Sequence, residues 1–190
     1  MRVGVLGLQG GFLEHIHMLG ALNVESKIIK YPEELEDVQA LIIPGGESTT
    51  IDRLMSDEFR QSIVEANKSR GIPIFGTCAG AIILAKKIHN GKEWQKPLGL
   101  IDIEIKRNAY GRQIDSFDTV INIPSLGTLI RAVFIRSPEI VNIGPKVKEL
   151  ANFEELPVLV QEGNVLVSTF HPELSVNPVV HKYFLSLVKS

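Results

Sequence analysis

The sequence has only one cysteine, Cys78, and this scarcity excludes a framework of disulfide bonds within the chain. It also lacks any run approaching the roughly 18 consecutive apolar residues that a membrane-spanning helix needs. Neither sign of charge dominates, because 20 basic and 22 acidic residues are interspersed and the formal net charge is −2. No long basic run or alternation of aromatic and basic residues is present, which argues against nucleic-acid partners. We therefore expect a globular protein of a reducing compartment, the cytoplasm.

What the sequence does contain is enough apolar material for one sizeable core. It has 190 residues, of which 44% are hydrophobic, and this is about the length of one domain. We expect a single domain over residues 1–190. The apolar stretch at residues 1–8 is short and has no small-residue cleavage site after it, so it predicts a first buried strand rather than a signal peptide.

Short β-branched runs alternate with helical patterns in the first half of the chain. Strands are expected at residues 2–8, 24–30 and 40–44, and helices at residues 48–55, 79–86 and 179–188. This alternation predicts an α/β fold in three layers, a mostly parallel open sheet with helices on both faces. Between residues 98 and 167 strands follow one another closely, so we expect them to add antiparallel strands at an edge of the sheet.

Cys78 lies in the string Gly-Thr-Cys-Ala-Gly at residues 76–80, between an apolar run and a predicted helix. This order of strand, sharp turn and helix is typical of a nucleophile elbow, in which glycines permit close packing around a strained residue. Unpaired N–H groups and the helix dipole at that position favour an anion, the thiolate that attacks. A lone cysteine is often only a small buried hydrophobe. The flanking glycines favour the nucleophile.

A candidate base and acid follow the expected strand at residues 165–168, as His171-Pro172-Glu173. In an extended segment residues i and i+2 point to the same side, and a proline keeps the residue before it extended. Glu173 is therefore able to orient the ring of His171, as the acid of a triad does. Because this string and the elbow both follow strands, the sequence predicts a triad of Cys78, His171 and Glu173 beyond the carboxyl ends of one sheet.

Two glycine-rich loops, at residues 7–11 and 44–50, suggest nucleotide binding, but their spacing argues against it. The first does not match the dinucleotide fingerprint, and the second lacks the lysine of a phosphate loop. What both offer is exposed backbone N–H groups near a helix start, which suit an oxyanion or a carboxylate. The alternative is plain turn chemistry. In the second loop, Ser48 or Thr49 is expected to cap the following helix.

The histidines outside the triad give no metal-ligand pattern. His15 and His17 are two residues apart on a predicted helix and so do not share a face. His89 and His181 have no neighbouring ligands in the sequence. We therefore expect no metal and no cofactor.

The elbow, the later His-x-Glu and the Pro-Gly-Gly at residues 44–46 together resemble the class I (triad) glutamine amidotransferases, whose fold is flavodoxin-like. Within them, strings at residues 7–10, 45–50, 76–80, 107–113 and 170–173 resemble the glutaminase subunits of pyridoxal 5′-phosphate synthase. The similarity extends nearly end to end. The strings at 45–50 and 107–113 are the most particular to this branch, whereas residues 89–97 and 137–155 match no fixed pattern.

The resemblance implies hydrolysis of L-glutamine to glutamate and ammonia through a glutamyl thioester on Cys78. It implies that the ammonia passes to a partner, the barrel subunit of pyridoxal 5′-phosphate synthase, for vitamin B6 biosynthesis. The backbone N–H groups of Ala79 and Gly46 are implied as the oxyanion hole. The implied glutamine-binding residues are Gly46, Glu47, Ser48, Arg107, Ile135 and Arg136.

The segment Gln9, Gly10 and Gly11 is the predicted switch, because glycine peptides reorient at low steric cost. Our hypothesis is that the glutaminase is weak alone and becomes active when its partner docks.

Three other functions remain open at this point. The first is the glutaminase subunit of another amidotransferase, such as imidazole glycerol phosphate synthase. The second is a cysteine protein of the DJ-1-like fold. The third is a non-catalytic assembly subunit with an idle triad. His171 and Glu173 count against the second, and glutamine turnover decides the third.

Overall fold

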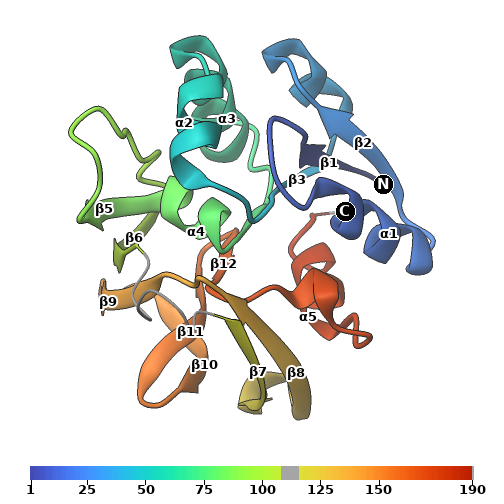
Figure 1. The fold of residues 1–190 in the computed structure, drawn as a ribbon. Helices are drawn as coiled ribbons and strands as arrows, with labels where there is room; N and C mark the ends of the chain where they lie inside the picture. The colour runs from blue at the N-terminus through green and yellow to red at the C-terminus, as the bar shows by residue number, and fades with distance from the viewer. Residues whose placement is uncertain (108–115, 190) are drawn as a thin grey trace.

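The computed structural model describes residues 1–107 and 116–189 (Figure 1). Its strands are β1 (Arg2–Leu6), β2 (Glu25–Ile29), β3 (Ala40–Ile43), β4 (Ile74–Thr77), β5 (Ala85–His89), β6 (Ile101–Lys106), β7 (Ser116–Ile123), β8 (Thr128–Ile135), β9 (Glu139–Ile143), β10 (Lys148–Phe153), β11 (Leu156–Glu162) and β12 (Val165–Ser168). Its α-helices are α1 (Phe12–Ala21), α2 (Ser48–Leu54), α3 (Asp57–Lys68), α4 (Ala79–Leu84) and α5 (Val179–Leu185), and its 3₁₀ helices are η1 (Pro32–Asp37), η2 (Pro124–Leu126) and η3 (Pro172–Leu174).

A seven-stranded sheet forms the centre of the molecule, in the order β10-β11-β12-β4-β3-β1-β2. The strands from β12 to β2 all pair in parallel, whereas β11 and β10 are antiparallel additions at one edge. This arrangement confirms the predicted α/β class and the antiparallel edge. It also brings the carboxyl ends of β4 and β12 side by side, since Thr77 pairs with Ser168 at the ends of these strands.

The remaining strands form sheets of their own, rather than all adding to the edge of the central sheet as predicted. Strands β5, β6 and β9 make a three-stranded sheet, and β7 pairs only with β8 among the described residues. The inward side chains of β6, Ile101, Ile103 and Ile105, join the core on one face of the central sheet. Those of β7, Ile121 and Ile123, join the core on the other face. These strands therefore cover the faces of the central sheet as helices do. The alternation of apolar and polar residues along a strand does not show whether it pairs within a sheet or packs against one.

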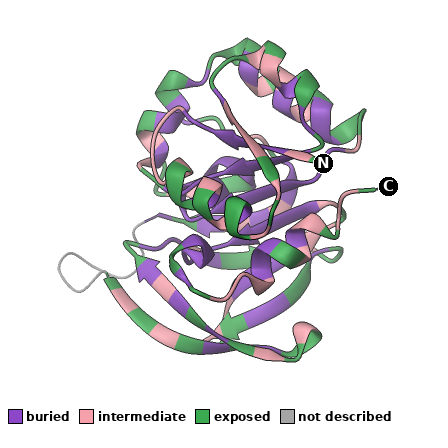
Figure 2. Cartoon of the chain, turned by 90° about the vertical axis from the view of Figure 1, so that its right-hand side faces the viewer, coloured by how far each residue is buried: buried purple, intermediate pink, exposed green. Residues whose placement is uncertain are grey.

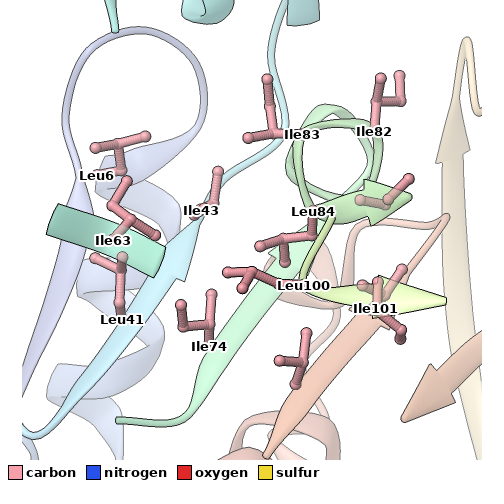
Figure 3. Close-up of a cluster of buried hydrophobic side chains, with 14 of the residues drawn as sticks. Leu6, Leu41, Ile43, Ile63, Ile74, Ile82, Ile83, Leu84, Leu100 and Ile101 are labelled. Atoms are coloured by element: carbon pink, nitrogen blue, oxygen red, sulfur yellow. The ribbon is translucent and has the colours of Figure 1, made fainter. Parts of the chain in front are cut away.

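Two cores lie on opposite faces of the central sheet because side chains alternate along its strands. In β3, Leu41 and Ile43 join one core, whereas Ala40 and Ile42 join the other. Figure 3 shows part of the first core, in which side chains of α3 and α4 meet those of β1, β3 and β4. Helices α1 and α5 cover the second face and lie together at the right of Figure 1. The middle strands β3, β4 and β12 are buried at every residue, whereas the edge strands β2 and β10 are partly exposed (Figure 2).

Three local expectations were wrong at helix ends. The last helix, expected at residues 179–188, ends at Leu185. The helix after Cys78 ends at Leu84 rather than residue 86, because Ala85 enters β5 and pairs with Ile101. The cap of α2 is Glu47, whose side chain accepts the Thr49 N–H at 3.4 Å, so neither Ser48 nor Thr49 caps it. In the part of the chain that is described, no helix combines the length and the apolar character needed to cross a bilayer.

Candidate active site

Cys78 occupies a sharp turn between β4 and α4, as a nucleophile elbow requires. Its backbone has φ 49° and ψ −100°, a conformation that side-chain-bearing residues rarely adopt. The turn is held because the Cys78 N–H donates to the Ser168 carbonyl at 2.9 Å. A Cβ atom at Gly80 would lie 2.0 Å from the Ile43 carbonyl oxygen, so only glycine allows this close approach.

His171 and Glu173 meet Cys78 at the end of the neighbouring strand. His171 Nδ1 lies 2.7 Å from Glu173 Oε1, and Cys78 is the other group that acts on the ring. The His171 N–H donates to the Val133 carbonyl at 2.8 Å, which fixes the backbone of this segment. A Cβ atom at Gly45 would lie 2.3 Å from His171 Cε1 and 3.3 Å from Cys78 Cβ. The loop containing Gly45 therefore passes directly beside the reactive groups.

The electrostatics favour an ion pair within this triad. Burial alone lowers the pKa of His171, but hydrogen bonds to Cys78 and Glu173 and their charges raise that pKa to about 10. Burial alone raises the pKa of Glu173, but His15 and His171 hold that pKa below its ordinary value. At neutral pH the site therefore holds an imidazolium with a carboxylate behind it.

A cleft of about 300 Å³ opens over the triad, large enough for a small polar molecule. Every residue predicted for the site contributes to its lining, and the structure thus brings them all together. The lining residues are Gln9, Gly10, Gly11, Glu14, Gly45, Gly46, Glu47, Ser48, Cys78, Ala79, Ile82, Arg107, Ile135, Arg136, His171, Glu173 and Leu174.

Two backbone N–H groups in the cleft are free to bind an anion. Ala79 is the first residue of α4, so its N–H has no acceptor within the helix. The N–H of Gly46 has no acceptor among the described residues. Both residues lie in the cleft with Cys78, where an oxyanion forms after nucleophilic attack.

The segment Gln9 to Gly11 is hydrogen-bonded to the neighbouring loop at residues 45–47. Gln9 Oε1 accepts the Glu47 N–H at 2.7 Å, and the Gly11 N–H donates to the Gly45 carbonyl at 2.9 Å. Gly10 lies between them with φ +104°, in the left-handed region that favours glycine. The two loops are therefore one hydrogen-bonded unit.

The SNO glutamine amidotransferase family model matches residues 5–190. The chain belongs to this family. It is 49% identical, over the full length of both chains, to the protein named pyridoxal 5′-phosphate synthase subunit PdxT from Thermotoga petrophila. A crystal structure described as a glutamine amidotransferase superposes with a TM-score of 0.93 at 45% identity, covering 98% of each chain. PurLQS from Thermotoga maritima shares the fold, with a TM-score of 0.72 at 19% identity over 99% of each chain.

The two arginines predicted for glutamine binding differ in their surroundings. In this amidotransferase Arg107 is buried, and its guanidinium donates to Gln95 Oε1 at 3.2 Å and Glu47 Oε1 at 3.4 Å. Arg136 is exposed, with φ 44°, and lines the same cleft. The rest of the predicted string after Arg107, residues 108–113, lies outside the described residues.

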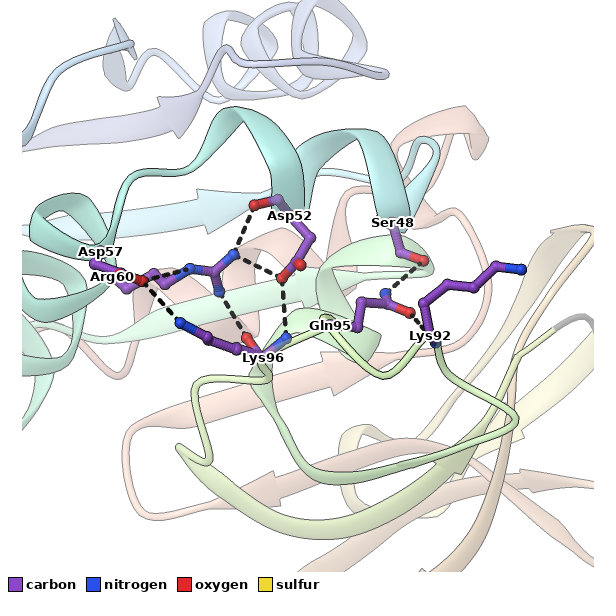
Figure 4. Close-up of polar contacts among 7 residues, drawn as sticks. All are labelled: Ser48, Asp52, Asp57, Arg60, Lys92, Gln95 and Lys96. Carbon is purple, nitrogen blue, oxygen red and sulfur yellow. Dashed lines mark hydrogen bonds and ion pairs between the residues drawn. The ribbon is translucent and has the colours of Figure 1, made fainter.

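The loop at residues 89–97, which matched no pattern, supports the cleft through Gln95. This side chain donates to Ser48 Oγ at 3.4 Å and accepts from the Lys92 N–H at 3.3 Å (Figure 4). Arg60 joins the same loop to α2, because it donates to the Lys96 carbonyl and to Asp52. No spacing in the sequence indicated the contacts of Gln95 with Ser48 and of Arg60 with Lys96, since these residues are 47 and 36 positions apart.

Other residues near the triad were also missed. Glu14 lines the cleft, and His15, Thr77 and His181 lie behind Glu173 in the interior. His15 and His181 lie 166 residues apart, so no spacing in the sequence links them. Across the described residues, no group of three or more candidate side chains is arranged to hold a metal ion.

The raised pKa of His171 predicts a pH-dependent stability. Stabilisation from this residue is complete below its ordinary pKa of 6.5 and is lost as the pH rises through about 10. We expect the melting temperature of the wild type to exceed that of His171→Asn most at pH 6.5, with the gap closing toward pH 10. His17→Asn, at an exposed position on α1, is the control. A gap that is the same at both pH values would contradict the ion pair.

Proposed function

We propose that this chain is the glutaminase subunit of a pyridoxal 5′-phosphate synthase, and that Cys78, His171 and Glu173 form its catalytic triad. Its product ammonia passes to a synthase subunit. One observation carries the triad: a strained cysteine and a buried histidine–carboxylate pair meet under a cleft large enough for glutamine. Full-length identity of 49% to the Thermotoga petrophila subunit supports the partner.

The chemistry follows from the positions of these groups. The Cys78 thiolate attacks the side-chain carboxamide of glutamine, and His171 gives a proton to the leaving nitrogen. Ammonia departs and a glutamyl thioester remains, which water activated by His171 hydrolyses to glutamate. Glu173 stabilises the imidazolium in each step. The N–H groups of Ala79 and Gly46 stabilise the oxyanion, and losing one such donor typically costs about 3 kcal/mol in the barrier.

Charged side chains in the lining of the cleft suit the charged groups of an amino acid. Arg136 and Arg107 are positioned to pair with the α-carboxylate, because a guanidinium matches a carboxylate with two parallel hydrogen bonds. The Glu47 carboxylate, already beside Arg107, suits the α-ammonium group. Gly46, Ser48 and Ile135 complete this pocket.

The segment Gln9 to Gly11 is suited to control the oxyanion hole from outside the triad. It hydrogen-bonds both neighbours of Gly46, so a change in its backbone alters the position of the Gly46 N–H. Ammonia is mostly protonated near neutral pH and is then a poor nucleophile, so its release is useful only inside the complex. Docking of the synthase subunit therefore acts as the trigger.

Glutamate release from glutamine, measured with and without a pyridoxal 5′-phosphate synthase barrel subunit, tests this function. We expect strong stimulation by the barrel subunit. Glutamate release that does not change when this partner is added would indicate that the chain belongs to another amidotransferase. No turnover under either condition would favour a non-catalytic subunit or a DJ-1-like protein.

A further inference from the structure

Two histidines from distant parts of the chain meet in the interior behind the triad. His15 in α1 and His181 in α5 are both completely buried, and His15 Nδ1 lies 3.0 Å from His181 Nε2. The other ring nitrogen, His15 Nε2, lies 3.2 Å from Thr77 Oγ1 and 3.5 Å from Glu173 Oε2. Both rings stand edge-on to Phe75 of β4. His15 thus approaches the carboxylate oxygen of Glu173 that His171 does not contact.

Glu173 has two carboxylate oxygens with different surroundings. Oε1 lies 2.7 Å from His171 Nδ1, whereas Oε2 is buried and has no hydrogen-bond partner within normal range. An ionised carboxylate in the interior is costly unless polar groups face both oxygens. His15 Nε2 faces Oε2 at 3.5 Å, so a proton on that nitrogen meets the carboxylate charge.

The hydrogen bond between the two histidines has one favourable direction. If His15 carries its proton on Nε2, its Nδ1 must accept, and His181 must donate from Nε2. His181 Nδ1 is then unprotonated, which agrees with its burial without any partner. The reverse direction leaves a buried N–H without an acceptor and turns a lone pair of His15 toward the carboxylate. Buried N–H groups without acceptors are rare.

Neither histidine adds a charge to the site. Burial lowers the pKa of both, that of His181 to about 3, so both rings are neutral at neutral pH. The charged or titratable groups acting on His15 are Glu14 on its own helix, and His171 and Glu173 after β12. His181 faces it from α5. The neutral pair therefore supplies a polar N–H to the Glu173 carboxylate, while the positive charge that faces this carboxylate stays on His171.

We propose that His15 is a positioning residue for the triad acid, and that His181 fixes the His15 tautomer. In this arrangement the His15 Nε2–H, shared with Thr77 Oγ1, steadies Oε2 of Glu173, and Oε1 stays directed at His171. His15 does not line the cleft and acts only through Glu173. It lies one turn after Gly11, so it also ties the position of α1, and of the segment that precedes it, to the acid.

The tautomer is measurable in the wild-type protein without any substitution. Nitrogen-15 NMR of histidine-labelled protein distinguishes a protonated Nε2 from a protonated Nδ1. We expect His15 and His181 both to be neutral with the proton on Nε2, assigned by the loss of each signal in a His→Gln variant. A proton on His15 Nδ1 would overturn the proposal.

Activity in the complex with the synthase subunit gives the second test. We expect His15→Leu to lower kcat by about 10-fold or more, as is typical when an outer hydrogen-bond partner is removed, with little change in the KM for glutamine. Without the His15 N–H the carboxylate of Glu173 protonates more readily. The acid limb of the kcat/KM profile should therefore move to higher pH.

Three further variants separate positioning from simple packing. His15→Gln keeps an N–H donor and should recover most of kcat, whereas His181→Leu should lower kcat less than His15→Leu and in the same direction. His17→Leu, exposed on the same helix, should match the wild type. Wild-type kcat and pH profile in folded His15→Leu, or a His15→Gln variant no better than His15→Leu, would overturn the proposal. If His15→Leu does not fold, the His181→Leu profile and the NMR tautomer decide it.

Discussion

Replacing Cys78 with alanine is expected to reduce glutamate release to background, a loss of about 10⁴-fold or more, because the nucleophile of a covalent mechanism is removed. The substitution should not unfold the protein. Cys78 is held at φ 49° by the bond from its N–H to Ser168 and by the packing of Gly80, and neither needs the sulfur atom. The measurement is glutamate production in the complex with the synthase subunit, beside the melting temperature of the same sample.

Cys78→Ser is the matched comparison for this prediction. It keeps a hydrogen-bonding group of similar size next to His171, but a hydroxyl is ionised far less readily than a thiol, so activity should also be very low. Mass spectrometry of acid-quenched wild type with glutamine should detect a glutamyl adduct on Cys78. Substantial turnover by Cys78→Ala would rule out the thioester mechanism and with it the proposed triad.

Replacing Gly10 with alanine is the second large effect that we expect. A Cβ atom there would lie 1.9 Å from the Gly45 carbonyl oxygen, and the residue already has φ +104°. Backbone has to move, since the obstacle is a carbonyl group rather than a flexible side chain. Because Gly45 precedes the oxyanion donor Gly46, we expect partner-stimulated activity to fall by about 10²-fold to 10³-fold, the usual effect of losing one donor.

Gly20→Ala is the control for Gly10→Ala. Gly20 lies in α1 with nothing within 4 Å of its Cβ position, so alanine should leave activity intact and raise helix stability by about 0.5–1 kcal/mol. The informative measurement is the ratio of glutaminase activity with and without the synthase subunit. Normal stimulation of Gly10→Ala would show that this segment is not the switch.

That Cys78, His171 and Glu173 would lie together was predictable because the signals are local. A glycine on each side of Cys78 and the short distance from His171 to Glu173 reflect constraints within a few residues. A sharp turn needs small neighbours, and an extended i, i+2 pair shares a side. The positions of both strings after apolar strands also predicted that they meet, since parallel strands end at one edge. Strand β12 does pair with β4 in the register that places them together.

The sheet partners of the later strands were not predictable in the same way. Strands β6 and β11 have similar lengths and apolar content, yet β11 extends the central sheet and β6 belongs to a separate one. Pairing is decided by which edge is free when the chain collapses, and residue alternation carries no such information. The same limit applies to Gln95, whose contacts with Ser48 and Arg107 depend on how a loop folds back over the helix.

Residue types and short spacings along the chain are enough to predict the chemistry proposed for this protein: one thiol at an elbow, a histidine and a carboxylate in reach of each other, and glycines where backbone must approach closely. The groups that lie behind this site come together only through packing of distant elements. His15 and His181 are 166 residues apart and become hydrogen-bonded neighbours because α1 and α5 cover the same face of the sheet. Contacts between side chains on separate elements arise from packing, and no spacing along the chain encodes them.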